Sequence, residues 1–248
     1  MMEKVQILNI GIQNLTEQQL LESLNEGVLF TPNVDHLLNL QRDKEFYECY
    51  QKAEWVICDS MILYLCSKLL PQRIIQAIPG STFLSRFYMY HRDDPDIRLF
   101  LLGAAPGVPQ EAMRRINARV GRKIVIGAHS PSFGFEKDSQ EIEDIIDLIN
   151  RSGATVVVVG VGAPKQEKFI IHYRDRMPDV KIWMALGATI DYEAGNKQRA
   201  PRIFQRLAIE WFYRMCTNPR LVKRYVSDLA FFPSFIAQLM GKYKNPFA

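Results

Sequence analysis

The sequence predicts an α/β protein in which helices cover both faces of a Rossmann-like parallel sheet and a helical C-terminal appendage follows. Short apolar runs alternate with helix-forming segments through the first 196 residues. The clearest run is 155–159, TVVVV, since five consecutive β-branched residues suit a strand buried on both faces. From Lys197 onward only helical patterns follow. We therefore expect a catalytic core at 1–196 and a basic helical appendage at 197–248.

The expected strands share a short apolar run that ends at polar, glycine or proline residues. They are 5–11, 28–30, 55–58, 97–102, 123–126, 155–159 and 182–186. Right-handed crossovers put the carboxyl ends of parallel strands at one edge of the sheet. The residues that follow these strands should converge there: Thr31, Asn33, Asp59, Gly103, Gly162 and Gln166.

The expected helices begin at capping residues or repeat apolar positions every three or four residues. Thr16 and Gln19 form a capping-box pattern, and PGST at 79–82 opens another helix. The segment GATIDYEAG, 187–195, is expected to be a loop. The helices are 16–25, 34–41, 44–51, 61–70, 79–90, 110–120, 140–150 and 165–176, with 201–216 and 219–229 in the appendage.

Composition limits the class of protein. With 248 residues, 48% of them hydrophobic, the chain can build one substantial core. Its four cysteines show no metal spacing and favour a reducing, cytosolic compartment. No signal-peptide pattern or membrane-spanning run is present. Asp94 and Asp96 match a two-aspartate metal pattern but precede a strand instead of following one, so we expect a solvated loop and no metal.

Charge is distributed unevenly along the chain. The net charge is +4, yet the segment from Lys197 onward holds ten basic and two acidic residues. The first 196 residues therefore carry about −4, and the appendage should meet an anionic partner. Nucleic acid, a diphosphate and a membrane surface all qualify on charge alone.

The segment 154–167, ATVVVVGVGAPKQE, has the pattern of a strand, a glycine turn and a helix start. Such a turn presents backbone N–H groups where α/β proteins hold phosphates, and Lys165 and Gln166 lie in the first helical turn. An ordinary turn with nothing bound is the alternative. The dinucleotide fingerprint lacks its third glycine, which disfavours a nicotinamide-dependent dehydrogenase, and no Walker pattern is present.

Several stretches together resemble the WecG/TagA/CpsF family of bacterial glycosyltransferases. They are TPN at 31–33 with His36, CDS at 58–60, PGS at 79–81, the strand and turn at 99–107, GVGAPKQE, GATIDYEAG with 199–201, and 210–225 with its EWFYR, NPR and RY elements. The resemblance implies a Rossmann-like core with a helical appendage, the GT-E fold. It also implies an inverting, metal-independent transfer of a hexose or N-acetylhexosamine that needs no cofactor. The donor would be a UDP-sugar and the partner a polyprenyl-diphosphate-linked acceptor at the cytoplasmic face of the membrane, in synthesis of cell-envelope polymers.

The resemblance also assigns roles to individual residues. Asp59 matches the proposed general base, which takes the proton of the acceptor hydroxyl, and its apolar neighbours would raise its pKa. Taken alone, Asp59 would instead be read as the N-cap of the helix that begins at Met61. Thr31 and Asn33 match polar residues of the same pocket. The matched substrate-binding positions are Gly103, Gly162, Lys165, Gln166, Glu167 and Asp191. For Gln166 the alternative is a plain exposed residue, and for Asp191 it is a role in fixing its loop.

Arginines of the appendage would stabilise the departing UDP, because guanidinium groups stay charged and bind diphosphate oxygens in pairs. The candidates are Arg199, Arg214, Arg220 and Arg224, and the alternative is a solvated basic face. The sequence departs from the family at Ser60, where glycine is usual, and at Ala77, where arginine is usual. Arg73 lies nearby.

Aromatic residues at 231–236, with Lys242 and Lys244 after them, fit either a helix lying on the membrane surface or a cover for the core. No nucleic-acid partner is expected, since the basic residues lack an interleaved stacking surface. A homo-oligomer stays open. A non-catalytic nucleotide- or nucleic-acid-binding module is the alternative function.

Overall fold

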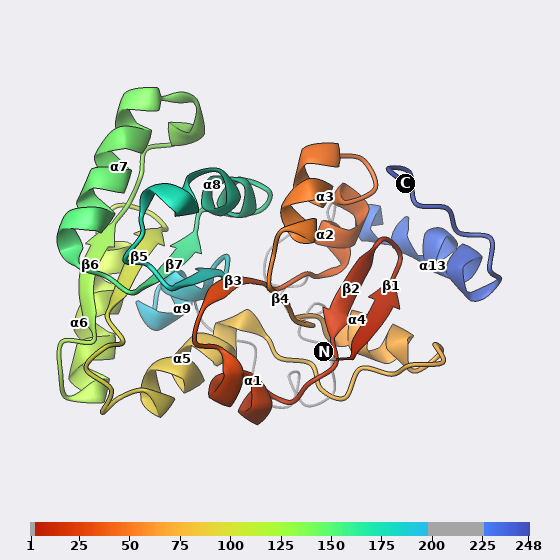
Figure 1. Ribbon diagram of the computed structural model, residues 1–248, viewed down its shortest axis with the longest axis horizontal. Coiled ribbons are helices and arrows are strands. Elements are labelled where there is room, and N and C mark those ends of the chain that lie inside the picture. The colour runs from red at the N-terminus through yellow and green to blue at the C-terminus, as the bar shows by residue number, and fades with distance from the viewer. Residues whose placement is uncertain (1–2, 198–225) are drawn as a thin grey trace.

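A six-stranded sheet forms the centre of the protein in the computed structural model, which describes residues 3–197 and 226–248 (Figure 1). The strand order is β4-β3-β8-β7-β5-β6, and every neighbouring pair is parallel. The predicted α/β fold class is therefore confirmed. The strands are β3 (Gly27–Phe30), β4 (Trp55–Val56), β5 (Leu99–Gly103), β6 (Val125–His129), β7 (Val156–Gly160) and β8 (Ile182–Ala185).

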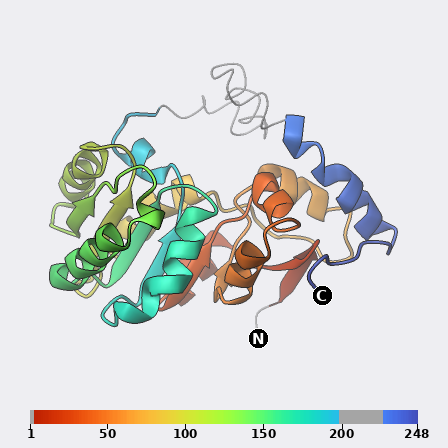
Figure 2. The same ribbon diagram turned by 90° about the horizontal axis from the view of Figure 1, so that it is seen from above.

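Helices lie on both faces of the sheet (Figure 1, Figure 2). Successive side chains of a strand point to opposite faces, so Val157 and Val159 of β7 join one apolar cluster while Val156 and Val158 join the other. The first cluster lies under α2 (Val34–Asn39), α3 (Lys44–Gln51), α4 (Met61–Ser67), α7 (Ser139–Ser152) and α8 (Lys165–Tyr173). The second lies under α1 (Glu17–Ser23), α5 (Gly80–Tyr90), α6 (Val108–Val120) and α9 (Thr189–Glu193).

Two short 3₁₀ turns, η1 (Phe135–Lys137) and η2 (Arg174–Arg176), flank α7 and α8. The capping box at Thr16 and Gln19 is confirmed, with the Gln19 amide N–H 3.2 Å from the Thr16 hydroxyl. The predicted span 44–51 of α3 is also confirmed, whereas α4 ends three residues before its predicted end.

The predicted first strand, 5–11, is wrong. The chain instead forms an antiparallel hairpin of β1 (Lys4–Ile7) and β2 (Ile10–Gln13), which lies outside the main sheet. Leu8 takes a positive φ of 52° and reverses the chain, while the Asn9 amide donates to the Leu40 carbonyl at 2.7 Å. Apolar alternation continues through the turn, so the pattern alone did not show the reversal.

The segment 187–195 is not the expected loop, because it contains the short helix α9. This helix packs against α5 and α6, with Ile190 fully buried. Thr189 donates its hydroxyl to the Leu186 carbonyl at 2.6 Å, and Glu193 accepts from the Tyr88 hydroxyl at 3.0 Å. Tertiary contacts stabilise α9, since a single short turn carries no helical periodicity in sequence.

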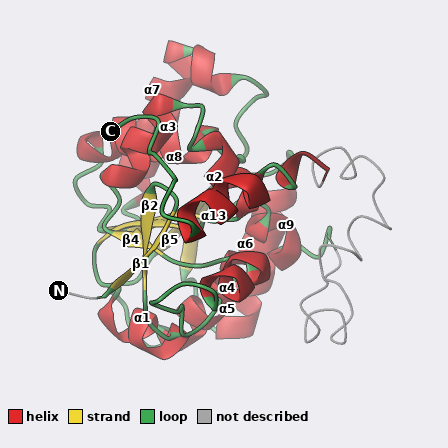
Figure 3. Ribbon diagram, turned by 90° about the vertical axis from the view of Figure 1, so that its right-hand side faces the viewer, coloured by secondary structure: helices red, strands yellow, loops and turns green. Residues whose placement is uncertain are grey.

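The C-terminal helix α13 (Phe231–Leu239) lies beside α2 (Figure 3) and is hydrogen-bonded to the N-terminal hairpin. Phe231 and Phe235 are buried in the first apolar cluster. Gln238 accepts from the Leu8 amide N–H and donates to the Gln6 carbonyl, both at 2.8 Å. The opposite face leaves Phe232, Ile236 and Met240 exposed. Thus α13 covers the core and also presents an apolar outer face.

Of the predicted appendage helices, 201–216 and all but the end of 219–229 lie outside the described residues. Within the described ranges, every helix is too short or too polar to span a bilayer.

Candidate active site

Asp59 follows β4 at the carboxyl edge of the sheet and is partly exposed. Its Oδ1 accepts a hydrogen bond of 2.6 Å from the backbone N–H of Gly80, the first residue of α5. This end of a helix carries partial positive charge, which stabilises a carboxylate. The alternative role as N-cap of α4 is wrong, because Ser60 fills that position and accepts from the Leu63 N–H.

Thr31 and Asp59 lie around one point, the α-carbon of Gly80. A Cβ at Gly80 would lie 3.4 Å from Thr31 Oγ1, 3.7 Å from Asp59 Oδ1 and 3.1 Å from Leu186 Cδ2. Thr31 also donates its hydroxyl to the Ala185 carbonyl at 3.2 Å. The ends of β3, β4 and β8 and the start of α5 therefore meet at this point.

Asn33 has an identifiable structural role next to this point. Its side-chain oxygen accepts from the His36 N–H at 3.2 Å and so caps α2. Burial raises the pKa of the neighbouring Cys58 thiol to about 12, so that thiol is neutral and no candidate nucleophile.

The turns after β5, β7 and β8 pack backbone against backbone. A Cβ at Gly103 would lie 2.4 Å from the Gly160 carbonyl oxygen, and one at Gly160 would lie 2.5 Å from the Gly187 carbonyl oxygen. Any side chain at Gly103 or Gly160 would force these turns apart. Gly162 has open space around it, and its φ of +89° is what favours glycine there.

Gln166 joins two of these turns. Its Oε1 accepts from the backbone N–H groups of Gly162 and Gly187, each at 3.2 Å, and its Nε2 donates to Glu167 Oε1 at 2.8 Å. Only 2% of Gln166 is exposed, so the alternative of a plain surface residue is wrong. The N–H of Gly162, predicted to be open to a phosphate, is bonded to the protein itself.

Glu167 is fully buried, and burial raises the pKa of its carboxyl group to about 7. Its Oε1 lies 4.0 Å from Nδ1 of His36, and that nitrogen is 2.8 Å from the Tyr50 hydroxyl. This polar group lies between α2, α3 and α8. Sequence reasoning missed Tyr50, because it occupies an ordinary apolar position of α3.

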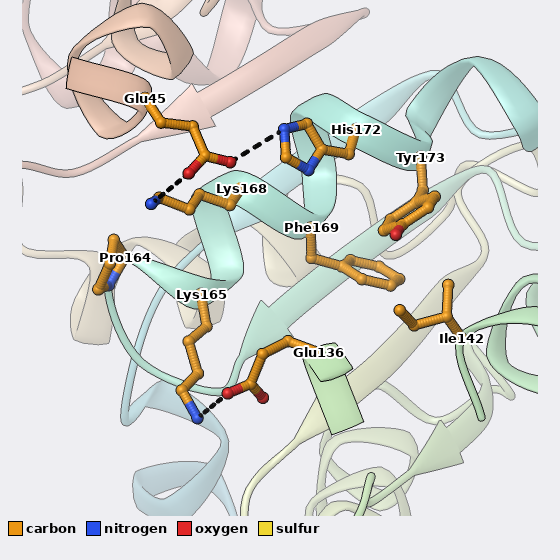
Figure 4. A pocket seen from close by; sticks show the side chains of 9 residues that line it. All are labelled: Glu45, Glu136, Ile142, Pro164, Lys165, Lys168, Phe169, His172 and Tyr173. Carbon is orange, nitrogen blue, oxygen red and sulfur yellow. Dashed lines mark hydrogen bonds and ion pairs between the residues drawn. The ribbon is translucent and has the colours of Figure 1, made fainter. Parts of the chain in front are cut away.

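The Lys165 side chain points towards Glu136 (Figure 4). Its Nζ lies 2.6 Å from Glu136 Oε1 and 5.0 Å from the ring centre of Phe133. It borders a pocket of about 290 Å³ with an apolar floor that includes Phe169 and Ile142. Across the pocket, Lys168 and His172 pair with Glu45 at 2.6 and 3.3 Å. This pocket lies on the flank of α8, and neither Asp59 nor Thr31 lines it.

Asp191 lies on α9, where its Oδ2 pairs with Lys197 Nζ at 3.0 Å and its backbone carbonyl accepts from the Asn196 N–H. These contacts favour the reading that Asp191 fixes its own segment. Through residues 3–197 and 226–248, no cluster of three or more His, Cys, Asp or Glu side chains is placed to hold a metal ion.

The sequence model of the WecG/TagA/CpsF glycosyl transferase family matches residues 5–245, nearly the whole chain. The chain belongs to this family. Membership makes it a glycosyltransferase of cell-envelope polysaccharide synthesis.

In this WecG/TagA/CpsF glycosyltransferase the two departures noted in the sequence have structural counterparts. Ser60 replaces the usual glycine and caps α4. Ala77, in place of the usual arginine, is partly buried and packs against the core. The candidate residues Arg199, Arg214, Arg220 and Arg224 lie outside the described residues.

Proposed function

We propose that this glycosyltransferase moves a hexose or an N-acetylhexosamine, such as N-acetylmannosamine, from a UDP-sugar to a polyprenyl-diphosphate-linked sugar. The transfer inverts the anomeric carbon and uses no metal. The observation that carries the proposal is Asp59, a partly exposed carboxylate that lies beside Thr31 and is held at the start of α5. Family membership supports the sugar donor and the lipid-linked acceptor as classes.

The reaction follows from one displacement at the anomeric carbon. Asp59 takes the proton of the acceptor hydroxyl while the oxygen of that hydroxyl bonds to C1. The bond between C1 and the UDP oxygen breaks, and UDP leaves with the electron pair. Because attack and departure occur on opposite faces, the configuration at C1 inverts.

The layout of the strands gives the donor a direction. The Gly162 turn after β7 and Asp59 after β4 are separated by three inter-strand spacings, roughly 14 Å. An extended nucleoside diphosphate sugar suits such a span, with its nucleotide near the turns of Gly103 and Gly162 and its C1 near Asp59.

The leaving group needs positive charge, and we assign that role to Arg199, Arg214, Arg220 and Arg224 of the appendage. The boundary between core and appendage at 196/197 belongs to the same proposal. The exposed face of α13, with Lys242 and Lys244 after it, would rest on the inner face of the cell membrane, where the lipid-linked acceptor lies.

The test is a panel of UDP-sugars incubated with a polyprenyl-diphosphate-linked sugar in EDTA and scored for UDP release. Turnover in EDTA with inverted product supports the proposal. Turnover only after a divalent metal is restored contradicts the metal-independent mechanism. Nucleotide or oligonucleotide binding without turnover of any donor would favour the non-catalytic module.

A further inference from the structure

The orientation of the Gln166 side-chain amide is decided by its surroundings. Two backbone N–H groups, those of Gly162 and Gly187, converge on one end of the amide at 3.2 Å each. Since an N–H group only donates, the amide oxygen has to face them. The Nε2 group must then face the other way, where it meets Glu167 Oε1 at 2.8 Å.

Glu167 provides the acceptor that makes this orientation the stable one. If the amide turned by 180°, its NH₂ group would face two N–H donors and its oxygen would face a carboxyl oxygen. We propose that Glu167 is a positioning residue that holds the Gln166 amide in register, so that Gln166 keeps the turns after β7 and β8 at a fixed separation.

The unfavourable free energy of burying Glu167 supports a positioning role for this residue. The side chain has no exposed surface, and within the described part of the chain its Oε2 has no hydrogen-bond partner. Burying a carboxyl group with incomplete hydrogen bonding destabilises a fold, and an apolar residue of similar size would cost less. Glu167 Oε1 makes a 2.8 Å hydrogen bond with Gln166 and a longer, 4.0 Å approach to His36, and an apolar residue can reproduce neither.

The oxygen of Glu167 that accepts from Gln166 also faces a second polar side chain. His36 of α2 lies 4.0 Å from Glu167 Oε1, and Tyr50 of α3 is bonded to His36. Burial raises the pKa of Glu167 to about 7, so both protonation forms are populated near neutral pH. Each form keeps an oxygen that accepts from Nε2, so positioning does not require the charge. Glutamine at position 167 should therefore still position the Gln166 amide, whereas methionine should not.

Hydrogen exchange of glycine amides tests the inference without any need for activity. Selective ¹⁵N-glycine labelling reduces the spectrum to the 14 glycines of the chain. In Glu167→Met, the Gly162 and Gly187 amides should exchange about tenfold faster than in the wild type, and both should change together. In Glu167→Gln the exchange rates of these two amides should stay within about twofold of the wild-type rates. Gly121 is the matched control, since its N–H donates to the Asn117 carbonyl at the end of α6.

Unchanged exchange rates at Gly162 and Gly187 in a folded Glu167→Met protein would overturn the inference. An equally large acceleration of exchange in Glu167→Gln would also overturn it. A wild-type measurement covers the case in which Glu167→Met does not fold. The Gln166 side-chain NH₂ resonance should shift with a midpoint near the titration of Glu167. A resonance that stays constant while the Glu167 carboxyl carbon titrates would also refute the contact.

Kinetics extend the test and rest on the proposed function. Glu167→Met and Gln166→Leu should each raise the KM for the donor by about tenfold with a smaller change in kcat. Because Glu167 acts through Gln166, the double variant should be no worse than Gln166→Leu alone. Additive losses would refute that dependence. If the protein showed no transferase activity, the proposed function would be wrong, but the hydrogen-exchange result would still test the role of Glu167.

Discussion

The carboxylate of Asp59 and the backbone N–H of Gly80 are joined by a 2.6 Å hydrogen bond that links the end of β4 to the start of α5. Gly80 has no side chain to separate them, and Thr31 closes the same space from β3. Three segments distant in sequence therefore fix the position of one carboxylate. Positions around this bond should control activity more than stability.

Gly80→Ala should lower turnover by about tenfold while changing the free energy of unfolding by less than about 1 kcal/mol. The added Cβ would lie 3.1 Å from a flexible Leu186 methyl group and 3.4 Å from the Thr31 hydroxyl, so the neighbours must shift. Steady-state kinetics and urea unfolding measure the two effects. Ser85→Ala, farther along α5, is the control and should retain activity. A Gly80→Ala enzyme with wild-type turnover would show that this spacing is unimportant.

Asp59→Asn should lower kcat by about 10²- to 10⁴-fold, since the amide cannot take the acceptor proton. The shape is retained, and the side-chain oxygen can still accept from Gly80. UDP release with excess donor and acceptor measures the change. Asp94→Asn, in the loop before β5, removes a carboxylate that pairs with His91 and should have little effect. Retention of most activity by Asp59→Asn would eliminate Asp59 as the base.

Stability should depend on pH through Glu167. Its pKa is raised by burial from 4.5 to about 7 in the folded protein, so folding favours the protonated form. The contribution is fully present below pH 4.5 and is lost as pH rises towards 7. Wild type should lose about 3 kcal/mol of unfolding free energy relative to Glu167→Gln over this range. Urea unfolding of both proteins at a series of pH values measures the difference.

Glu143→Gln is the control for that titration. Arg176 lowers the pKa of Glu143 through a hydrogen bond, so any contribution there has the opposite sign and disappears as pH falls. A wild-type curve parallel to that of Glu167→Gln at every pH would mean that Glu167 titrates normally.

Phe235→Ala should destabilise the protein by about 3 kcal/mol, because its ring is 2% exposed and stacks on Phe231 in the core. Phe232→Ala, on the outer face of the same helix, should change stability by less than about 0.5 kcal/mol. Chemical unfolding of the two variants compares them directly. Equal effects would mean that α13 is not docked as described.

Replacement of Phe232 and Ile236 by serine should weaken binding to anionic vesicles without unfolding the protein, since both side chains are exposed in part and neither belongs to the buried core. These substitutions are cleaner than deletion of 230–248, which also removes the buried Phe231 and Phe235. Phe133→Ser is the matched control, because Phe133 is fully exposed on a different element. Equal co-sedimentation of the wild type, the double serine variant and Phe133→Ser with vesicles would argue against this membrane surface.

Local pattern predicted the sheet well, because runs such as 155–159 have one stable environment, a strand covered on both faces. Local pattern failed at Leu8, where a positive φ reverses the chain between equally apolar residues, and at α9, which depends on packing of Ile190. It also failed to choose between Asp59 and Ser60 as a cap, since both residue types suit that position.

The candidate site was predicted as a set of positions, and the structure adds what each side chain contacts. Thr31 and Asp59 converge as expected from parallel strands. The link from Gln166 through Glu167 towards His36 and Tyr50 could not be predicted, because it joins α2, α3 and α8 in three dimensions. The roles of the four arginines remain predictions.

The two hydrogen bonds from Gln238 to the hairpin join residues 230 or more positions apart. During synthesis on the ribosome, the Leu8 N–H group cannot form its hydrogen bond until Gln238, near the end of the chain, has emerged. The hairpin is thus the first part made and among the last to be completed, and a nascent chain stalled before α13 would expose the apolar surface that Phe231 and Phe235 later cover.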